Sequence, residues 1–473
     1  MSSILWHDYE TWGVNPRQDF PVQFAGIRTD LELNVIDKPL NYFCQIPNDY
    51  LPHPEACLVT GITPQQSLRD GYIEAEFAKK LYALMSLPET CTAGYNSIKF
   101  DEEVSRHLFY RNFYPVYERE YENGNSRWDI IDLVRAAYAL RPDGIEWPVY
   151  EENGKPCFKL EMLSKANGIE HADAHDALSD VYATIGMAKL IKEKHPKLYH
   201  FFFSLRNKHE VAKIIDVYKQ QAFLYVSGFI DSSQGCCAWM MPLCFHPQNK
   251  NIVLAVNLSK DTDTLLDNDI DAFSDPDFVS DLFASKQMPF MQIAINKCPF
   301  VAPAKMLTPE LAQRLGIDRQ LCLHRYQQLK QSSDIIQKCI AVFDKPFTDT
   351  SDQDIDTQLY TRDFPGPADK AVMSQIRDSK PVSLTAIYDN LPNGDIKRQL
   401  FRYIGRNYPA QMNESMLARW QAHRKSRFIE SGNQGYLSIE AFQLSIESLV
   451  QEHAGNANKL AILRALERYA SEL

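Results

Sequence analysis

The sequence has 473 residues, of which 45% are hydrophobic, so it can bury the cores of about three domains at the usual ~150 residues each. Its formal net charge of −11 excludes a protein that coats nucleic acid by bulk attraction, and any grip on phosphates requires a local basic groove. The ten cysteines contain no C-x-x-C pair and no apolar run approaches the ~18 residues that span a membrane, so we expect a soluble, cytoplasmic protein without structural zinc.

The first predicted strand runs from Ile4 to Gly13 and carries two carboxylates, Asp8 and Glu10. Side chains alternate along a strand, so these two acids share a face. At ~4 Å they would repel by roughly 4 kcal/mol at an effective dielectric constant of ~20. Carboxylate oxygens suit hard divalent cations such as Mg2+ and Mn2+. The motif therefore predicts half of a metal site, although many strands end in Asp-x-Glu only because they leave the core.

Alternating strands and helices follow. We predict strands at residues 23–29, 41–45 and 90–96, a helix that begins at Pro64 after the cap Thr63, a helix that begins at Asp101 and continues to Phe113, and a helix over 128–140. An acid in a first helical turn is favoured by the helix dipole, which is the ordinary explanation for Asp101. The alternation predicts an α/β domain with a mixed sheet.

A helix near residue 180 carries the next acid. Its predicted core stripe is formed by Leu178, Val181, Tyr182 and Ile185. Asp180 lies off that stripe, and its neighbours one turn away, Ala177 and Thr184, are small enough to leave room beside the carboxylate. His175 lies five residues earlier, where we expect a loop that leads into the helix.

The pattern changes after about residue 194. Short apolar runs at 222–226, 238–242, 252–256 and 291–295, separated by turn-like stretches, predict a small β-barrel or sandwich, and helices follow at about 308–343. The acidic, polar run 348–357 is typical of a linker. Helical periodicity continues from about 352 to the end.

Taken together, Asp8, Glu10, Asp101 and Asp180, with His175 before the last, resemble the acids and histidine of the DEDDh exonuclease superfamily. More specifically, the chain resembles the bacterial exodeoxyribonuclease I family at residues 7–11, 60–64, 94–96, 100–104, 125–129 and 166–171. The resemblance covers essentially the whole chain. It implies an RNase H-like exonuclease domain with a mixed sheet over 1–194, an SH3-like β-barrel domain over 195–348 and an α-helical C-terminal domain over 352–473.

The resemblance also implies an activity. The expected reaction is stepwise 3′→5′ hydrolysis of single-stranded DNA to 5′-mononucleotides, in DNA repair and recombination, by a two-metal-ion mechanism. The four acids would hold two Mg2+ ions, which Mn2+ can replace, and His175 would take the proton from the attacking water. The ordinary alternative for His175 is a solvated loop histidine beside Asp176.

Family members of this kind contact the DNA strand through Glu10 and through residues that match Arg106, Tyr117, Tyr121, Arg135 and Lys159. Arginine and lysine suit phosphates, and aromatic rings stack on unpaired bases. The alternative for each is a surface charge or a core aromatic. In addition, Arg398, Arg402 and Arg406 repeat at helical spacing, which is compatible with a channel wall or with a solvated helix face.

The expected partners are single-stranded DNA and, by the same resemblance, the single-stranded-DNA-binding protein, which docks on a monomer. Two alternative functions remain open. One is a DEDDh ribonuclease or proofreading nuclease, which shares the catalytic residues but is commonly a lone nuclease domain. The other is a non-catalytic single-strand DNA-binding protein, against which the complete set of acids argues.

Overall fold

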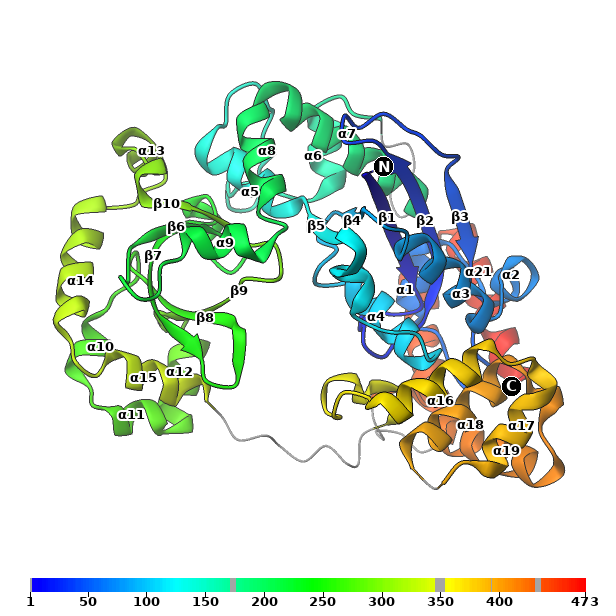
Figure 1. Ribbon diagram of the computed structural model, residues 1–473. Helices are drawn as coiled ribbons and strands as arrows, with labels where there is room; N and C mark the ends of the chain where they lie inside the picture. Colours follow the sequence, from blue (N-terminus) through cyan, green and yellow to red (C-terminus); the bar gives the residue numbers. More distant parts are fainter. Residues whose placement is uncertain (1, 171–175, 345–353, 393, 430–434) are drawn as a thin grey trace. The chain divides into compact units, whose positions relative to one another are not determined.

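The computed structural model describes residues 2–170, 176–344, 354–392, 394–429 and 435–473. The chain forms two compact units, the first from residues 1–126, 172–182 and 349–473 and the second from residues 127–171 and 183–348 (Figure 1). Each unit combines segments that are far apart in the sequence. None of the helices in the described ranges is both long enough and apolar enough to cross a bilayer.

A five-stranded sheet organises the N-terminal part of the chain, with strand order β3-β2-β1-β4-β5. Its strands are β1 (Ser3–Thr11), β2 (Pro21–Thr29), β3 (Leu40–Phe43), β4 (Thr90–Gly94) and β5 (Ser126–Asp129). Strand β1 pairs antiparallel with β2 and parallel with β4. The predicted mixed sheet is thus confirmed, and β1 is an internal strand whose first residues are buried on both faces.

Four helices lie between these strands in the sequence, and the second and fourth of them begin where the sequence predicted a helix, whereas the first and third were not predicted. They are α1 (Pro54–Thr60), α2 (Pro64–Asp70), α3 (Glu74–Met85) and α4 (Asp101–Arg111). The Thr63 side chain accepts a hydrogen bond from the Gln66 amide, so the predicted N-cap of α2 is confirmed. Helix α4 ends before the predicted Phe113, whose φ of 62° cannot continue a right-handed helix.

Two hydrophobic clusters include residues of this sheet. One is built from strands β1 and β2 and helices α3 and α4, and its members include Leu5, Tyr9, Phe24, Phe77, Leu81, Val104 and Leu108. The other includes Trp12, Phe20, Val22, Ile46, Tyr50, Phe442, Ile446, Leu463, Leu466 and Tyr469. The last five come from α20 (Ile439–Glu452) and α21 (Ala457–Ser471). The C-terminal helices therefore complete a core that begins near residue 12.

The remaining C-terminal helices form a third cluster. They are α16 (Pro367–Asp378), α17 (Leu384–Asn390), α18 (Asp395–Asn407) and α19 (Glu414–Ile429). Gly405 of α18 lies against the Trp420 ring of α19, and a Cβ atom at this glycine would approach the ring to 2.5 Å. A glycine is thus required for the close approach of these two helices.

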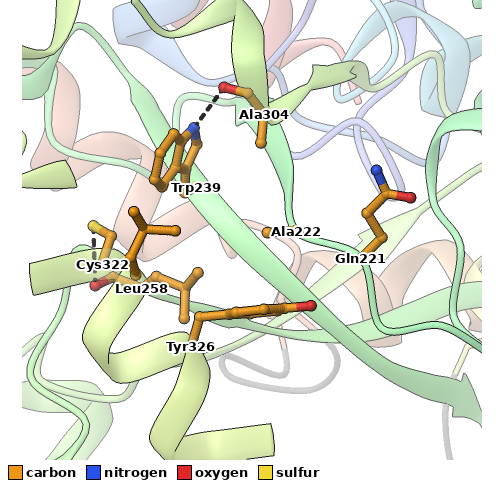
Figure 2. Close-up of a pocket in the computed structure, with 8 residues that line it drawn as sticks. Gln221, Ala222, Trp239, Leu258, Ala304, Cys322 and Tyr326 are labelled. Atoms are coloured by element: carbon orange, nitrogen blue, oxygen red, sulfur yellow. Dashed lines mark hydrogen bonds between the residues drawn. The ribbon is translucent and has the colours of Figure 1, made fainter. Parts of the chain in front are cut away.

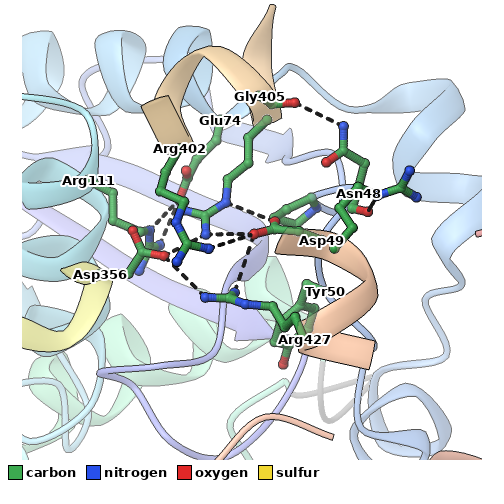
Figure 3. Close-up of polar contacts among 12 residues, drawn as sticks. Asn48, Asp49, Tyr50, Glu74, Arg111, Asp356, Arg402, Gly405 and Arg427 are labelled. Carbon is green, nitrogen blue, oxygen red and sulfur yellow. Dashed lines mark hydrogen bonds and ion pairs between the residues drawn. The ribbon is translucent and has the colours of Figure 1, made fainter. Parts of the chain in front are cut away.

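A buried network of ion pairs joins this C-terminal region to the N-terminal part of the first unit (Figure 3). The Arg406 guanidinium donates to both carboxylate oxygens of Asp49, at 2.9 Å each, and to Asp356 at 2.5 Å. Arg427 pairs with Asp49 at 3.4 Å and with Asp354 at 2.6 Å. Although burial alone would raise it, the pKa of Asp49 lies well below its usual value because Arg406 and Arg427 favour the ionised form.

This network bears on two predictions from the sequence, the role of the arginine row in α18 and the linker at 348–357. Arg402 and Arg406 pair with buried carboxylates, whereas Arg398 pairs with Asp395 near the surface. These ion pairs favour the interpretation that the three arginines stabilise the fold over the interpretation that they line a channel. The predicted linker 348–357 is wrong from residue 354 onward, because Asp354 is buried and Ile355–Tyr360 form a 3₁₀ helix, η5.

The second unit contains an antiparallel sheet of order β10-β6-β7-β8-β9. Its strands are β6 (Phe223–Val226), β7 (Cys237–His246), β8 (Asn249–Asn257), β9 (Phe290–Ala294) and β10 (Phe300–Pro303). Register shifts interrupt the pairing of β7 and β8 near Pro242 and Phe245, and such bulges bend strands. The four predicted strands are confirmed, and they belong to one antiparallel sheet. Strand β10 was missed because it has only four residues and ends in proline.

The second unit also contains helices. They are α5 (Ile131–Leu140), α6 (Leu160–Ala166), α8 (Pro196–Ser204), α9 (Lys208–Ile214), α10 (Asp263–Asp267), α11 (Ile270–Ser274), α12 (Pro276–Ala284), α13 (Pro309–Arg314), α14 (Arg319–Gln331) and α15 (Ile335–Phe343). The predicted helix over 128–140 begins only at Ile131, because Trp128 belongs to β5 and is buried against Tyr199. Helices α10 to α12 were not predicted, since two of them have only five residues.

Candidate active site

On one face of strand β1 the side chains change from buried and apolar to half-buried and acidic. Ile4 and Trp6 are fully buried, whereas Asp8 and Glu10, the next residues on the same face, are half-buried. Tyr9 lies on the opposite face, within the hydrophobic cluster formed with α3 and α4. The strand is thus fixed by its apolar residues and delivers two adjacent carboxylates at its end.

Helix α7 (Ala177–Lys194) supplies a third carboxylate to the same place. Asp180 lies in the first turn of α7 and is half-buried. One carboxylate oxygen each of Asp8, Glu10 and Asp180 can be chosen so that all three lie within 4.8 Å of one another. The convergence that the linear sequence could not show is therefore present for these three acids. The predicted core stripe of α7 holds for Val181 and Ile185, but Tyr182 is 46% exposed.

Asp101 lies beside this group at the start of α4. Its side chain is buried, and Oδ1 accepts a hydrogen bond from the Tyr9 backbone N–H at 3.0 Å. Since Tyr9 stands between Asp8 and Glu10, this bond ties the start of α4 to the acidic end of β1. Asp101 also acts electrostatically on both neighbouring acids.

The mutual repulsion of these groups is visible in their pKa values. Burial, followed by the charges of Asp101, Glu10, Asp180 and Asp176, raises the pKa of Asp8 well above its usual value. Burial, followed by Asp180, Asp101 and Asp176, raises the pKa of Glu10 to about 8. Every charge named as acting on these two pKa values is that of another acid, and a set of close, half-buried carboxylate oxygens fits a hard divalent cation. The residues therefore suit the metal that the sequence predicted.

The predicted proton acceptor, His175, lies outside the described residues. The next residue, Asp176, is described, and sequence reasoning missed its proximity to the acids. Asp176 precedes α7 and its Oδ2 accepts a hydrogen bond from the Ser179 N–H at 3.2 Å, as an N-cap residue does. An aspartate just before an apolar helical pattern is typical of an N-cap, and this was the feature of the sequence that could have identified Asp176.

Two of the predicted DNA-contact residues, Arg106 and Tyr117, lie together in the first unit. Arg106 is buried, and its guanidinium pairs with Glu103 at 3.0 Å and with Glu120 at 2.7 Å. It also lies 5.2 Å from the centre of the Tyr117 ring, which contacts Phe364 edge-on. Arg106 is thus a paired residue that positions an aromatic ring.

The other predicted contact residues differ in exposure. Tyr121, also in the first unit, is 64% exposed. In the second unit, Arg135 donates to Asp132 at 2.7 Å, and Lys159 is exposed immediately before α6. The structure brings Asp8, Glu10, Asp101 and Asp180 together, and the DNA-contact roles of these other residues stay predictions.

A separate cavity of about 250 Å³ lies in the second unit between β7 and α14 (Figure 2). It is lined by Gln221, Ala222, Trp239, Leu258, Ala304, Cys322, Leu323 and Tyr326. The Trp239 indole N–H donates to the Ala304 carbonyl at 2.9 Å, and the Tyr326 hydroxyl to the Gln220 carbonyl at 3.0 Å. Because no acid or histidine is among these described lining residues, the cavity lacks the groups for metal-assisted hydrolysis.

Family models match the chain over three consecutive ranges. Residues 5–188 match the model described as exonuclease, residues 206–345 the exonuclease I SH3-like domain, and residues 353–473 the exonuclease I C-terminal domain. The acids of the cluster all lie within the first range.

Curated relatives extend over the full chain. Exodeoxyribonuclease I of Escherichia coli (strain K12) is 42% identical over 474 residues, which cover 100% of this chain and 98% of the relative. Exodeoxyribonuclease I of Haemophilus influenzae is 43% identical over 480 residues, again covering 100% and 98%.

Solved structures are similar over the same extent. E. coli exonuclease I in complex with a dA16 oligonucleotide has a TM-score of 0.93 at 42% identity and covers 100% of both chains. A zinc-bound E. coli exonuclease I–single-stranded DNA complex has a TM-score of 0.92, and a structure of the single-stranded-DNA-binding protein with exonuclease I and the inhibitor CFAM has 0.91. Both are 41% identical and cover 100% of this chain and 99% of the other.

Proposed function

The chain belongs to the exodeoxyribonuclease I family, and from this membership we infer that it hydrolyses single-stranded DNA stepwise from the 3′ end. It is an exodeoxyribonuclease, and its products are 5′-mononucleotides. The observation that carries this conclusion is the meeting of Asp8, Glu10 and Asp180 within 4.8 Å, in a chain that matches its relatives from end to end. DNA repair and recombination are the processes consistent with this activity.

The exonuclease depends on a divalent metal, and we propose that the metal is Mg2+, with two ions in each active site and with Mn2+ as a substitute. Asp8, Glu10, Asp101 and Asp180 would hold the ions, directly or through water. When bound, the ions supply positive charge at the scissile phosphate and make water a stronger nucleophile. The repulsion that raises the pKa values of Asp8 and Glu10 supports this assignment, because a divalent cation removes it.

Groups of the protein itself carry out the proton transfer and position the acids. His175, with an ordinary pKa near ~6.5, is proposed to accept the proton of the attacking water. Asp101 is held by the Tyr9 N–H, which fixes the start of α4 against β1. These roles assign catalysis to the domain that we place at residues 1–194. We propose that the β-rich domain at 195–348 and the helical domain at 352–473 help to hold the DNA strand.

DNA binding is proposed to use Glu10, Arg106, Tyr117, Tyr121, Arg135 and Lys159. Rings such as that of the exposed Tyr121 can stack on unpaired bases, at about 1–3 kcal/mol per base. Arg106 would act with Tyr117, whose ring it contacts. Lys159 offers a flexible point charge to a phosphate, without the two-pronged geometry of arginine.

The partners of the enzyme are single-stranded DNA and the single-stranded-DNA-binding protein, as the complexes of its relatives indicate. We propose that it acts as a monomer in the cytoplasm. The tail of the binding protein, acidic and apolar, would dock on a basic surface patch.

Digestion of end-labelled oligonucleotides tests the proposed reaction. With Mg2+, a 3′ label on single-stranded DNA should be released at once as a mononucleotide, while a 5′ label should remain on a shrinking ladder. Double-stranded DNA should be digested slowly and EDTA should stop the reaction. Faster loss of RNA of the same length would identify a ribonuclease instead, and binding without release would identify a non-catalytic DNA-binding protein.

A further inference from the structure

The side chain of Gln23 joins three elements beside the acidic cluster. It lies on β2 directly opposite Glu10 of β1 and is only 3% exposed. Its amide donates one hydrogen bond to Asn41 Oδ1 at 3.0 Å and another to Asp176 Oδ1 at 3.2 Å. Asn41 pairs with β2 from β3, whereas Asp176 precedes α7. Gln23 therefore links the edge of the sheet to the start of the helix that carries Asp180.

Asp176 transmits this link to α7. While its Oδ1 accepts from Gln23, its Oδ2 accepts from the Ser179 N–H at 3.2 Å, and its carbonyl accepts from the Asp180 N–H at 3.1 Å. Both carboxylate oxygens and the carbonyl are thus engaged. A shift of Asp176 would shift the first turn of α7, and with it the Asp180 carboxylate.

Asp176 lies near two other acids of the site. Its charge raises the pKa values of both Asp8 and Glu10, so it lies close enough to these acids to be repelled by them. Arginine or lysine at this place would pair with the acids and compete with a metal ion. An amide donates hydrogen bonds to Asp176 without adding a competing positive charge.

We propose that Gln23 is a positioning residue of the metal site: its amide holds Asp176, and through the first turn of α7 it keeps Asp180 aligned with Asp8 and Glu10. This role rests on the proposed metal-dependent function. Gln23 acts through Asp176 and Asp180, and its removal weakens metal binding while the fold remains.

Mn2+ binding to the full-length chain, measured by isothermal titration calorimetry, tests this role without relying on activity. Gln23→Met keeps the length of the side chain and removes its donors, and it should weaken Mn2+ binding about tenfold, or about 1.4 kcal/mol. The Mg2+ concentration for half-maximal DNA digestion should rise by a similar factor. Gln45→Met is the matched control, because the Gln45 amide donates only to the Leu68 carbonyl among its described contacts.

The melting temperature in EDTA separates positioning from a general loss of structure. Gln23→Met and Gln45→Met should melt alike, while only the first loses metal affinity. Asp176→Ala should weaken Mn2+ binding about as much as Gln23→Met. The double variant should bind Mn2+ as tightly as the single variant with the lower affinity, because both changes break the same link. Gln23→Leu, which has a similar volume, adds no charge and also removes the amide donor, offers a second route if Gln23→Met does not fold.

Two results would overturn the role of Gln23. One is wild-type Mn2+ affinity in folded Gln23→Met or Gln23→Leu, and the other is an additive, about hundredfold loss in the double variant. Failure of the wild-type chain itself to bind Mn2+ would instead contradict the proposed metal-dependent function. The two failures are therefore distinguishable in one titration series.

Discussion

Replacing Asp180 with asparagine should make the metal-free protein more stable while it abolishes the nuclease. The change removes one of three carboxylates whose oxygens lie within 4.8 Å of one another. At that distance and an effective dielectric constant of about 20, each ionised pair repels by about 3.5 kcal/mol. Loss of a negative charge from the first turn of α7 subtracts only about 0.3–1 kcal/mol of helix-dipole stabilisation. Of these two effects, the relief of repulsion is the larger.

The change of folding stability with pH provides a second check of this prediction. The pKa of Glu10 rises on folding from its ordinary 4.5 to about 8, with Asp180 as the largest cause after burial. An acid whose pKa is raised on folding binds its proton more tightly in the folded state, so stability is lost as pH rises from about 4.5 to about 8. In EDTA, wild-type protein should therefore lose stability across this range, and Asp180→Asn should lose less.

Thermal unfolding in EDTA at pH 5 and pH 8, followed by circular dichroism, measures the effect. At pH 8 we expect Asp180→Asn to gain about 1–3 kcal/mol, which is a rise of several degrees in melting temperature. Glu193→Gln is the matched control, since it removes an exposed charge from the same helix and should change little. An Asp180→Asn variant that is less stable than wild type at pH 8, or that still releases nucleotides, would refute the proposed convergence of charge.

Three further predictions address other parts of the molecule. Asp8→Ala should abolish nucleotide release while a fluorescence-anisotropy assay still detects binding of single-stranded DNA; release near the wild-type rate would contradict the catalytic role of this acid. His175→Ala should slow single-turnover hydrolysis by about 10²–10⁴-fold and leave Mn2+ binding intact, and an unchanged rate would remove its assigned role. Asp49→Ala should destabilise the first unit by about 3–5 kcal/mol in urea unfolding, because Arg406 and Arg427 would lose a buried partner; a loss below about 1 kcal/mol would show that water compensates.

Local patterns explain why much of the fold was predictable. The apolar run before Asp8 predicts a buried strand, and the Thr63-Pro64 pair predicts the start of α2, because both depend on neighbouring residues. Asp101 was likewise expected at a helix start. The spacing of the acids identified the active-site residues only through a family resemblance.

Tertiary contacts explain what the sequence did not predict. Trp128 favoured a helix by its position before an apolar stretch, but it is buried in a strand against Tyr199. Asp356 and its acidic neighbours were interpreted as a linker, because the arginines that pair with them lie about 50 or more residues away in the sequence. The link from Gln23 to Asp176 spans 153 residues and depends on strand register, which no local pattern specifies.

The shared core of the chain's two ends affects how the enzyme is made. The Tyr469 hydroxyl donates to the Tyr50 carbonyl, 419 residues earlier, and helices α20 and α21 cover the cluster that contains Trp12. A ribosome that adds about 5–20 residues per second exposes β1 tens of seconds before α21 emerges. The core around Trp12, just after β1, therefore stays incompletely buried until α21 has been made. A nascent chain that ends before α20 thus lacks the C-terminal part of this core, whereas the cluster that holds Leu5 and Tyr9 of β1 is formed by residues 5–114.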